Sequence, residues 1–181
     1  MLTFWRYGYE TTSIVDLTTA MGVTAPSLYT AFDDKKQLFL EAARRYAGDP
    51  EAMAQAFERA ETAHDAARDM LISATIAFTG ETTPRGCLLA SATASGSSAS
   101  ADVQQVIAEI RTGIAARLRA RIARDVDSKT LPPDTDAAAL AGMVMALIQG
   151  MSVLARDGTE RAQLLAIVAQ TMKAWPARSS S

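Results

Sequence analysis

The sequence predicts an all-α protein, and three observations lead to this prediction. Alanine is the commonest residue, at 36 of 181 positions, and it enters helices without loss of side-chain entropy. Apolar residues recur at the spacing of one helical face along most of the chain. No stretch of useful length alternates apolar and polar residues as a half-buried strand does.

Composition excludes several classes of protein. Hydrophobic residues make up 49% and charged residues 21%, the balance of a globular chain that can bury a core. With a net charge of −2, any nucleic-acid binding has to come from a local surface. The single cysteine, Cys87, excludes internal disulfides and cysteine-rich zinc sites and fits a reducing cytoplasm. With one histidine, His64, as well, we expect no enzyme activity, no metal and no cofactor.

A helix-turn-helix is predicted at residues 12–32. N-cap candidates at residues 11–13 begin a helix that runs to about Met21, and Gly22-Val23-Thr24 breaks it. Thr24 can cap a second, short helix that ends at Phe32. A tight turn of this kind lets two helices cross steeply, as they must if the second is to enter a major groove.

A third N-terminal helix is predicted to begin after Asp34. Asp34 and Gln37 have the spacing of a capping box, and Gly48 is placed to end the helix. We therefore expect a small three-helix domain over residues 1–48, formed by these helices.

The remaining residues, 49–181, predict a larger helical bundle. Breaks are expected at residues 83–86, 95–100 and 131–133, where Gly, Pro and Ser gather. The helices expected between them are Glu51–Ala63, Asp65–Thr79, Cys87–Thr93, Ala101–Val126, Thr135–Arg156 and Glu160–Ala174.

The last two of these helices are more apolar than a monomer needs. The uncharged run between Asp136 and Arg156 is nearly long enough to cross a bilayer, but it has no aromatic belt, so we interpret it as a buried helix of a soluble protein without membrane contact. A helix apolar nearly all round is buried on more than one side, which predicts a homodimer. The residues expected at the dimer interface are Leu140, Val144, Ile148, Met151, Leu164, Val168, Met172 and Trp175.

Several motif segments occur in order over the N-terminal domain. They are Gly8-Tyr9-Glu10-Thr11-Thr12-Ser13, Gly22-Val23-Thr24, Leu28-Tyr29-Thr30-Ala31-Phe32 and Lys35-Lys36-Gln37-Leu38-Phe39. Through them the chain resembles the TetR/AcrR family of bacterial transcriptional regulators. Arg85-Gly86-Cys87-Leu88-Leu89 and the run from Gln149 to Arg156 extend the resemblance into the C-terminal part.

The resemblance implies an all-helical homodimer that represses genes and releases operator DNA when a small molecule binds. Phosphate and base contacts would come from the helix-turn-helix and the helix after it. Carried over by position, the residues implied are Thr12, Ser13, Thr24, Ala25, Pro26, Ser27, Tyr29, Thr30 and Lys35.

The chain departs from the family pattern in two ways. The family has a full first helix before the Gly-Tyr pair, and here only Leu2–Tyr7 remains of it, which indicates either a start upstream of Met1 or a short form with weakened DNA binding. Residues 1–48 also carry as many acidic as basic side chains, and the recognition helix has no basic one. The alternative function is therefore a dimeric ligand-binding module of the same fold that has lost DNA binding.

An effector pocket is expected among the helices of the C-terminal bundle. Met70, Phe78, Met143 and Leu147 are the candidate lining residues, and the scarcity of charge on inner faces favours an apolar or aromatic effector. Other features have plain interpretations. We expect Cys87 to be buried and inert, His64 to be exposed, and the arginines at 117, 121 and 124 to form a solvated face.

Overall fold

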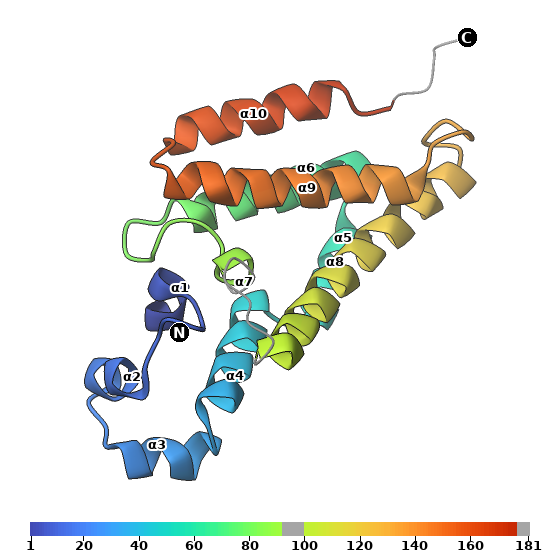
Figure 1. Ribbon diagram of the computed structural model, residues 1–181. Coiled ribbons are helices and arrows are strands. Elements are labelled where there is room, and N and C mark those ends of the chain that lie inside the picture. The colour runs from blue at the N-terminus through green and yellow to red at the C-terminus, as the bar shows by residue number, and fades with distance from the viewer. Residues whose placement is uncertain (92–99, 177–181) are drawn as a thin grey trace.

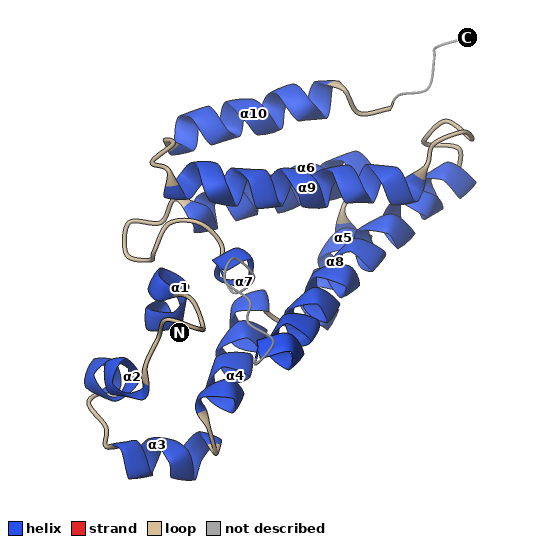
Figure 2. Cartoon of the chain, viewed as in Figure 1, coloured by secondary structure: helices blue, strands red, loops and turns tan. Residues whose placement is uncertain are grey.

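Helices form the regular structure of residues 1–91 and 100–176, which are the residues that this computed structural model describes (Figure 1, Figure 2). No strand occurs among these residues, as the sequence predicts. The predicted break at 95–100 and the end of the predicted helix Cys87–Thr93 lie largely outside them. The helices are α1 (Leu2–Tyr7), α2 (Ile14–Met21), α3 (Ala25–Phe32), α4 (Lys35–Ala47), α5 (Pro50–Arg59), α6 (Ala63–Phe78), α7 (Leu88–Ser91), α8 (Ala101–Asp127), α9 (Ala137–Arg156) and α10 (Arg161–Lys173).

Side-chain caps fix the starts of the N-terminal helices. The Ser13 hydroxyl accepts a hydrogen bond from the Asp16 amide and the Asp16 carboxylate accepts one from the Ser13 amide, which completes a capping box at α2. Thr24 accepts from the amide of Ser27 at α3, as predicted from the sequence. Between them Gly22 takes a left-handed conformation (φ 65°), which glycine adopts without strain. These local signals define the helix-turn-helix.

An aromatic cluster holds α1 against α4. The rings of Phe4 and Phe39 meet edge to face with their centroids 5.1 Å apart, and those of Trp5 and Tyr46 do so at 4.8 Å. Phe4 and Phe39 are both fully buried. The short α1 is therefore part of the N-terminal core, because it supplies two of the large side chains that α4 packs against.

The C-terminal bundle is built around α6, α8 and α9. In Figure 1, α6 and α9 run side by side, α10 lies along them, and the long α8 crosses diagonally toward α4. Leu71, Ile122, Val144 and Leu164 each come from a different one of these helices, and all four are fully buried. Burying such side chains contributes about 1.5–3 kcal/mol each, so this core is a large part of what holds the bundle together.

The eight residues predicted for the dimer interface lie inside the single chain instead. None of Leu140, Val144, Ile148, Met151, Leu164, Val168, Met172 and Trp175 is more than 9% exposed. The outward side of α9 carries mostly small residues, namely Ala139, Gly142, Ala146, Gly150 and Val153, all of which are exposed. The larger apolar stripe therefore packs against the chain's own core, and the small-residue stripe is left outside.

α9 also has the length and hydropathy of a membrane span. It is the one helix in the described residues that passes this test, and 33% of its apolar window is buried in the single chain. Core helices of soluble proteins pass the same test, so composition alone does not place α9 in a membrane.

A buried ion pair joins α8 to the turn between α5 and α6. Arg121 and Asp125 are 6% and 4% exposed and hydrogen-bond to each other. The guanidinium also donates to three carbonyls, those of Ala60 and Glu61 in the turn and Phe57 O in the last turn of α5 at 2.9 Å, and the carboxylate accepts from the Ala63 amide at 2.6 Å. The expectation of a solvated arginine face is therefore wrong for Arg121, because these carbonyls and the Ala63 amide satisfy both charged groups inside the protein.

A close approach between segments far apart in the chain fastens α1 to the end of α9. The indole of Trp5 donates to Gly86 O at 2.9 Å, and Arg156 donates to Trp5 O at 3.5 Å. Gly86 has φ +83°, and a Cβ added there would lie 2.7 Å from the Arg156 side chain and 2.9 Å from Ser152 O. Only glycine fits this contact. The next residue, Cys87, donates from its amide to the Ser152 hydroxyl at 2.8 Å.

Candidate DNA-binding surface and ligand cavity

The second helix of the helix-turn-helix, α3, lies at the end of the molecule farthest from α10 (Figure 1). Its Pro26, Ser27, Tyr29 and Thr30 are exposed, and Tyr29 is 45% exposed despite its large ring. Leu28 is the one fully buried side chain of the helix and ties it to the N-terminal core. The arrangement leaves one face of α3 free to enter a groove.

Hydroxyl groups dominate the start of α3. The Thr24 and Ser27 hydroxyl oxygens lie 2.9 Å apart, and the Thr30 hydroxyl donates to Pro26 O at 2.9 Å. Both Thr24 and Ser27 remain exposed, as does the α2 cap Ser13. Hydroxyls and helix N-termini are common phosphate ligands in DNA-binding proteins, so this cluster suits contacts to the DNA backbone.

Two of the predicted DNA-contacting side chains are held inside the N-terminal unit. Thr12 is 1% exposed and its hydroxyl donates to Gly8 O at 2.6 Å. The Lys35 ammonium donates to Tyr9 O and Thr12 O, both at 3.0 Å, and lies 4.5 Å from the centre of the Tyr9 ring. These contacts occupy both groups, so we correct their assignment from phosphate contacts to supports of the turn between α1 and α2.

The neighbouring Lys36 joins the N-terminal unit to the bundle. Its ammonium lies 2.6 Å from the carboxylate of Asp102, at the start of α8. This hydrogen bond raises the pKa of Lys36 and lowers the pKa of Asp102. Both groups are exposed, so the pair is a weak contact that salt screens. It nevertheless marks where α4 meets α8.

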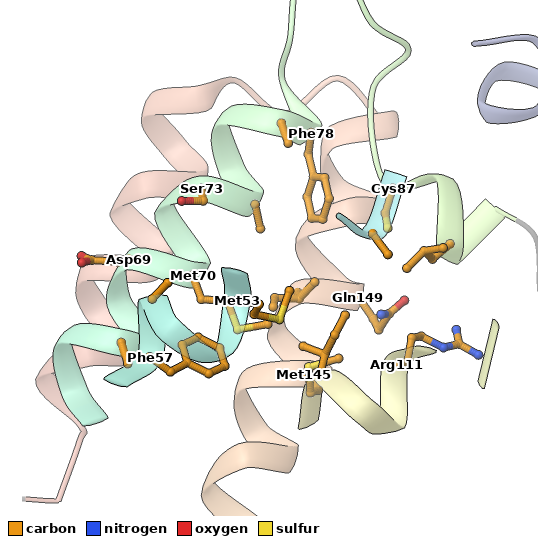
Figure 3. Close-up of a pocket in the computed structure, with 18 of the residues that line it drawn as sticks. Met53, Phe57, Asp69, Met70, Ser73, Phe78, Cys87, Arg111, Met145 and Gln149 are labelled. Carbon is orange, nitrogen blue, oxygen red and sulfur yellow. The ribbon is translucent and has the colours of Figure 1, made fainter. Parts of the chain in front are cut away.

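A cavity of about 490 Å³ lies between α4, α5, α6, α8 and α9 (Figure 3). Its volume is within the range of small-molecule sites. Most of its lining is apolar. The larger apolar side chains around it are Met53, Phe57, Met70, Phe78, Leu89, Ile114, Met145 and Ile148.

The sequence identified two of these side chains as effector-binding candidates and missed the rest. Met70 and Phe78 line the cavity as expected. Met143 is instead 37% exposed on the outer side of α9, and Leu147 is partly buried against the core and is not in the cavity lining. Successive helical residues point about 100° apart, so Met145 faces the cavity where Met143 cannot. No signal in the sequence marks which face of an apolar helix borders an empty space.

The polar groups of the cavity are few. Tyr46 and Cys87 lie together on one wall, where burial and the neighbouring thiol raise the pKa of Tyr46 well above its ordinary value. Arg111 and Gln149 lie on one side of the cavity, and Asp69 and Ser73 on the other (Figure 3).

The predictions for Cys87 and His64 differ in outcome. Cys87 is buried, as expected. His64 is half-buried rather than exposed, because its ring meets that of Trp175 edge to face at 5.9 Å. Among residues 1–91 and 100–176, no three His, Cys, Asp or Glu side chains gather as metal ligands do.

An exposed helix-turn-helix joined by one helix to a bundle with an apolar cavity defines a class of protein, the DNA-binding regulators with a separate helical C-terminal domain. Residues 3–42 match the family described as "Bacterial regulatory proteins, tetR family", and residues 66–172 match "Tetracyclin repressor-like, C-terminal domain". The chain belongs to the TetR family, and it is a TetR-family transcriptional regulator of all-helical fold.

Similar proteins agree with this family assignment. The HTH-type transcriptional repressor ComR of Escherichia coli (strain K12) is 32% identical over 178 residues, which are 97% of this chain and 85% of ComR. A cysteine-substituted form of the TetR family regulator CifR, solved in complex with a 26-base-pair operator DNA, is 34% identical. It superposes with a TM-score of 0.90 over 97% of this chain and 92% of CifR. A putative TetR regulator from Rhodococcus sp. RHA1 is 35% identical, with a TM-score of 0.68, over 97% and 94% of the two chains.

Proposed function

We propose that this protein is a ligand-responsive transcriptional repressor that binds a near-palindromic operator as a homodimer and is released by a small-molecule effector. The observation that carries the proposal is the course of α4. This helix begins at Lys35, directly after the exposed α3, and its last residues, Tyr46 and Ala47, line the cavity. A ligand that moves the end of α4 therefore moves the helix-turn-helix as well.

The DNA contacts are assigned to the exposed residues of the helix-turn-helix. Base edges and nearby phosphates would be met by side chains and amides from α3 and its cap, with the α2 cap on the flanking backbone. An operator complex of CifR, which has the same fold at 34% identity, supports a DNA-binding role for this domain. The residues proposed are Ser13, Thr24, Ala25, Pro26, Ser27, Tyr29 and Thr30, and we no longer include Thr12 and Lys35.

The dimer contact is assigned to the outward side of α9 with the adjoining side of α10. Exposed small residues such as Gly142, Ala146 and Gly150 let a second helix approach closely. Two subunits paired there would present their α3 helices to successive major grooves, about 34 Å apart or a multiple of it. We place such a dimer in the cytoplasm, without membrane contact.

A charge at the small-residue stripe tests the dimer. We expect Ala146→Glu to convert a dimer to a monomer in sedimentation velocity, because the carboxylate would be buried without a partner. Ala52→Glu, at an exposed position of α5, is the control and is expected to remain dimeric. A dimeric Ala146→Glu protein would exclude this face as the interface.

Operator binding is tested by fluorescence anisotropy with DNA from upstream of the protein's own gene. A scrambled duplex and two salt concentrations serve as controls, since phosphate contacts make affinity fall with salt. Tight, sequence-dependent binding would support the repressor. Equal binding to both duplexes would favour the alternative, a ligand-binding module without DNA recognition. That alternative rests on an α3 with no basic side chain and on the zero net charge of residues 1–48.

Effector release has a thermodynamic test of its own. If a ligand weakens operator binding by some factor, the operator must weaken ligand binding by the same factor. We therefore expect a ligand of the cavity to bind less tightly to the operator complex than to the free protein. Equal ligand affinity in the two states would contradict the switching mechanism.

A further inference from the structure

The polar side chains of the cavity differ in whether they already have partners. Asp69, the only carboxylate among the described lining residues, accepts hydrogen bonds from Arg68 at 3.1 Å and lies at the exposed rim. Arg111 is the only cationic residue in this described lining, and it is half-buried. Among the described residues, no carboxylate lies within ion-pair distance of Arg111, and its guanidinium makes no hydrogen bond.

Gln149 strengthens the same side of the cavity. It comes from α9, is half-buried, and makes no hydrogen bond within the described residues. Figure 3 shows Gln149 and Arg111 on the side away from Phe57 and Met70. A guanidinium and an amide together offer several N–H donors to one acceptor group, which is the chemistry that recognises an oxyanion.

The rest of the lining determines what else the ligand must carry. Three aromatic rings, three methionines and several aliphatic side chains surround the space between the two polar ends. Methionine adapts its shape and contacts aromatic rings favourably, so a flat or irregular apolar body fits such a lining. A neutral ligand would leave Arg111 with no charged partner in the cavity, and a cation would meet it with the same sign of charge.

From these observations we propose that the effector is an anionic amphiphile, an apolar or aromatic body that carries one carboxylate-like group held by Arg111 with Gln149. This inference rests on the proposed function, because it names the chemical class of the effector for the same cavity. It adds to the composition-based expectation of an apolar or aromatic effector the requirement for a negative charge at one end.

Three probes that differ only in their end group test the proposal. They are 2-naphthylacetate, its neutral amide 2-naphthylacetamide, and 2-(2-naphthyl)ethylammonium, titrated into the full chain by isothermal calorimetry without DNA. We expect the carboxylate to bind at least about tenfold more tightly than the amide, which is the size of one charge-assisted hydrogen bond. The ammonium is expected to bind most weakly. Tighter or equal binding of the amide or ammonium, or no carboxylate binding at about 5 mM, would overturn the proposal.

Substitution at Arg111 tests whether this side chain causes the preference for the carboxylate probe. Arg111→Met keeps an apolar stem and removes the charge, so it should abolish the carboxylate preference and bring carboxylate binding to the level of the amide. Arg119→Met, an exposed arginine on the same helix, is the matched control and should keep the preference. A preference that survives Arg111→Met would assign the recognition elsewhere. These measurements contain no DNA, so they stand or fall separately from operator release.

Discussion

The buried pair of Arg121 and Asp125 leads to a strong prediction about stability. Replacing Asp125 by alanine leaves a guanidinium that is 6% exposed without its counter-ion, and it removes the acceptor for the Ala63 amide at the start of α6. Breaking a buried ion pair from one side costs about 3–5 kcal/mol. Three backbone carbonyls still receive hydrogen bonds from Arg121, so we expect the lower end, about 3 kcal/mol.

Urea unfolding followed by circular dichroism measures this loss. Protein concentration must be held fixed, because the proposed dimerisation would make apparent stability depend on it. For a chain of this size, about 3 kcal/mol corresponds to a drop in Tm of roughly 6–12 °C. Asp127→Ala, two residues further along α8 at an exposed position, is the control and should change the free energy of unfolding by less than about 0.5 kcal/mol.

A double-mutant cycle separates the pair from the other contacts. We expect Arg121→Met and Asp125→Leu together to cost less than the sum of the two single changes, by at least about 1 kcal/mol. The double variant should still be less stable than the native protein, because the turn carbonyls and the Ala63 amide lose their partners. An Asp125→Ala protein as stable as Asp127→Ala would refute the reasoning.

Three further predictions concern the N-terminal unit and its attachment. Lys35→Met should lower the free energy of unfolding by about 1 kcal/mol and leave the salt dependence of operator binding unchanged. If the slope of log affinity against log salt concentration fell by about one unit instead, Lys35 would be assigned to the phosphate contacts again. Gly86→Ala should lower Tm clearly more than Gly158→Ala in calorimetry, since both glycines have positive φ but only Gly86 has atoms where the new Cβ would go; equal shifts would exclude the clash. The serine that caps α2 lowers the pKa of Asp16, so stabilisation by this carboxylate is present above its unfolded-state pKa and lost as pH falls through the folded one. The stability difference from Asp16→Asn should therefore vanish in acid, and a difference that persists at pH 2 would contradict this assignment.

The helices of the N-terminal unit could be predicted because their signals are local. Ser13, Thr24 and Asp34 each cap a helix through the amide three residues later, a relation visible in the sequence itself. Gly22 marks the turn in the same way. The bounds of α3 agree with the prediction because Thr24 begins the helix and the chain turns at Asp33 after it.

The faces of the C-terminal helices could not be predicted from such signals. α9 is apolar nearly all round, so the sequence does not distinguish the inward Ile148 and Met151 from the outward Met143. The same holds for Arg121 and Asp125, whose spacing of four residues is equally common on solvated helices. Their burial depends on Phe57 O and the Ala63 amide, which lie more than sixty residues away in the chain. Tertiary contacts of this range leave no local pattern.

The contact of Trp5 with Gly86 and Arg156 limits how this protein can be recombined with its relatives. A chimera that joins residues 1–48 to another sensing domain would lose the indole hydrogen bond and the Arg156 contact, unless the new domain supplies the same glycine and arginine. The aromatic pair of Trp5 and Tyr46 would remain within the transplanted part. Successful domain exchange would therefore have to carry three pieces together, namely the N-terminal unit, the segment around Gly86 and the end of α9.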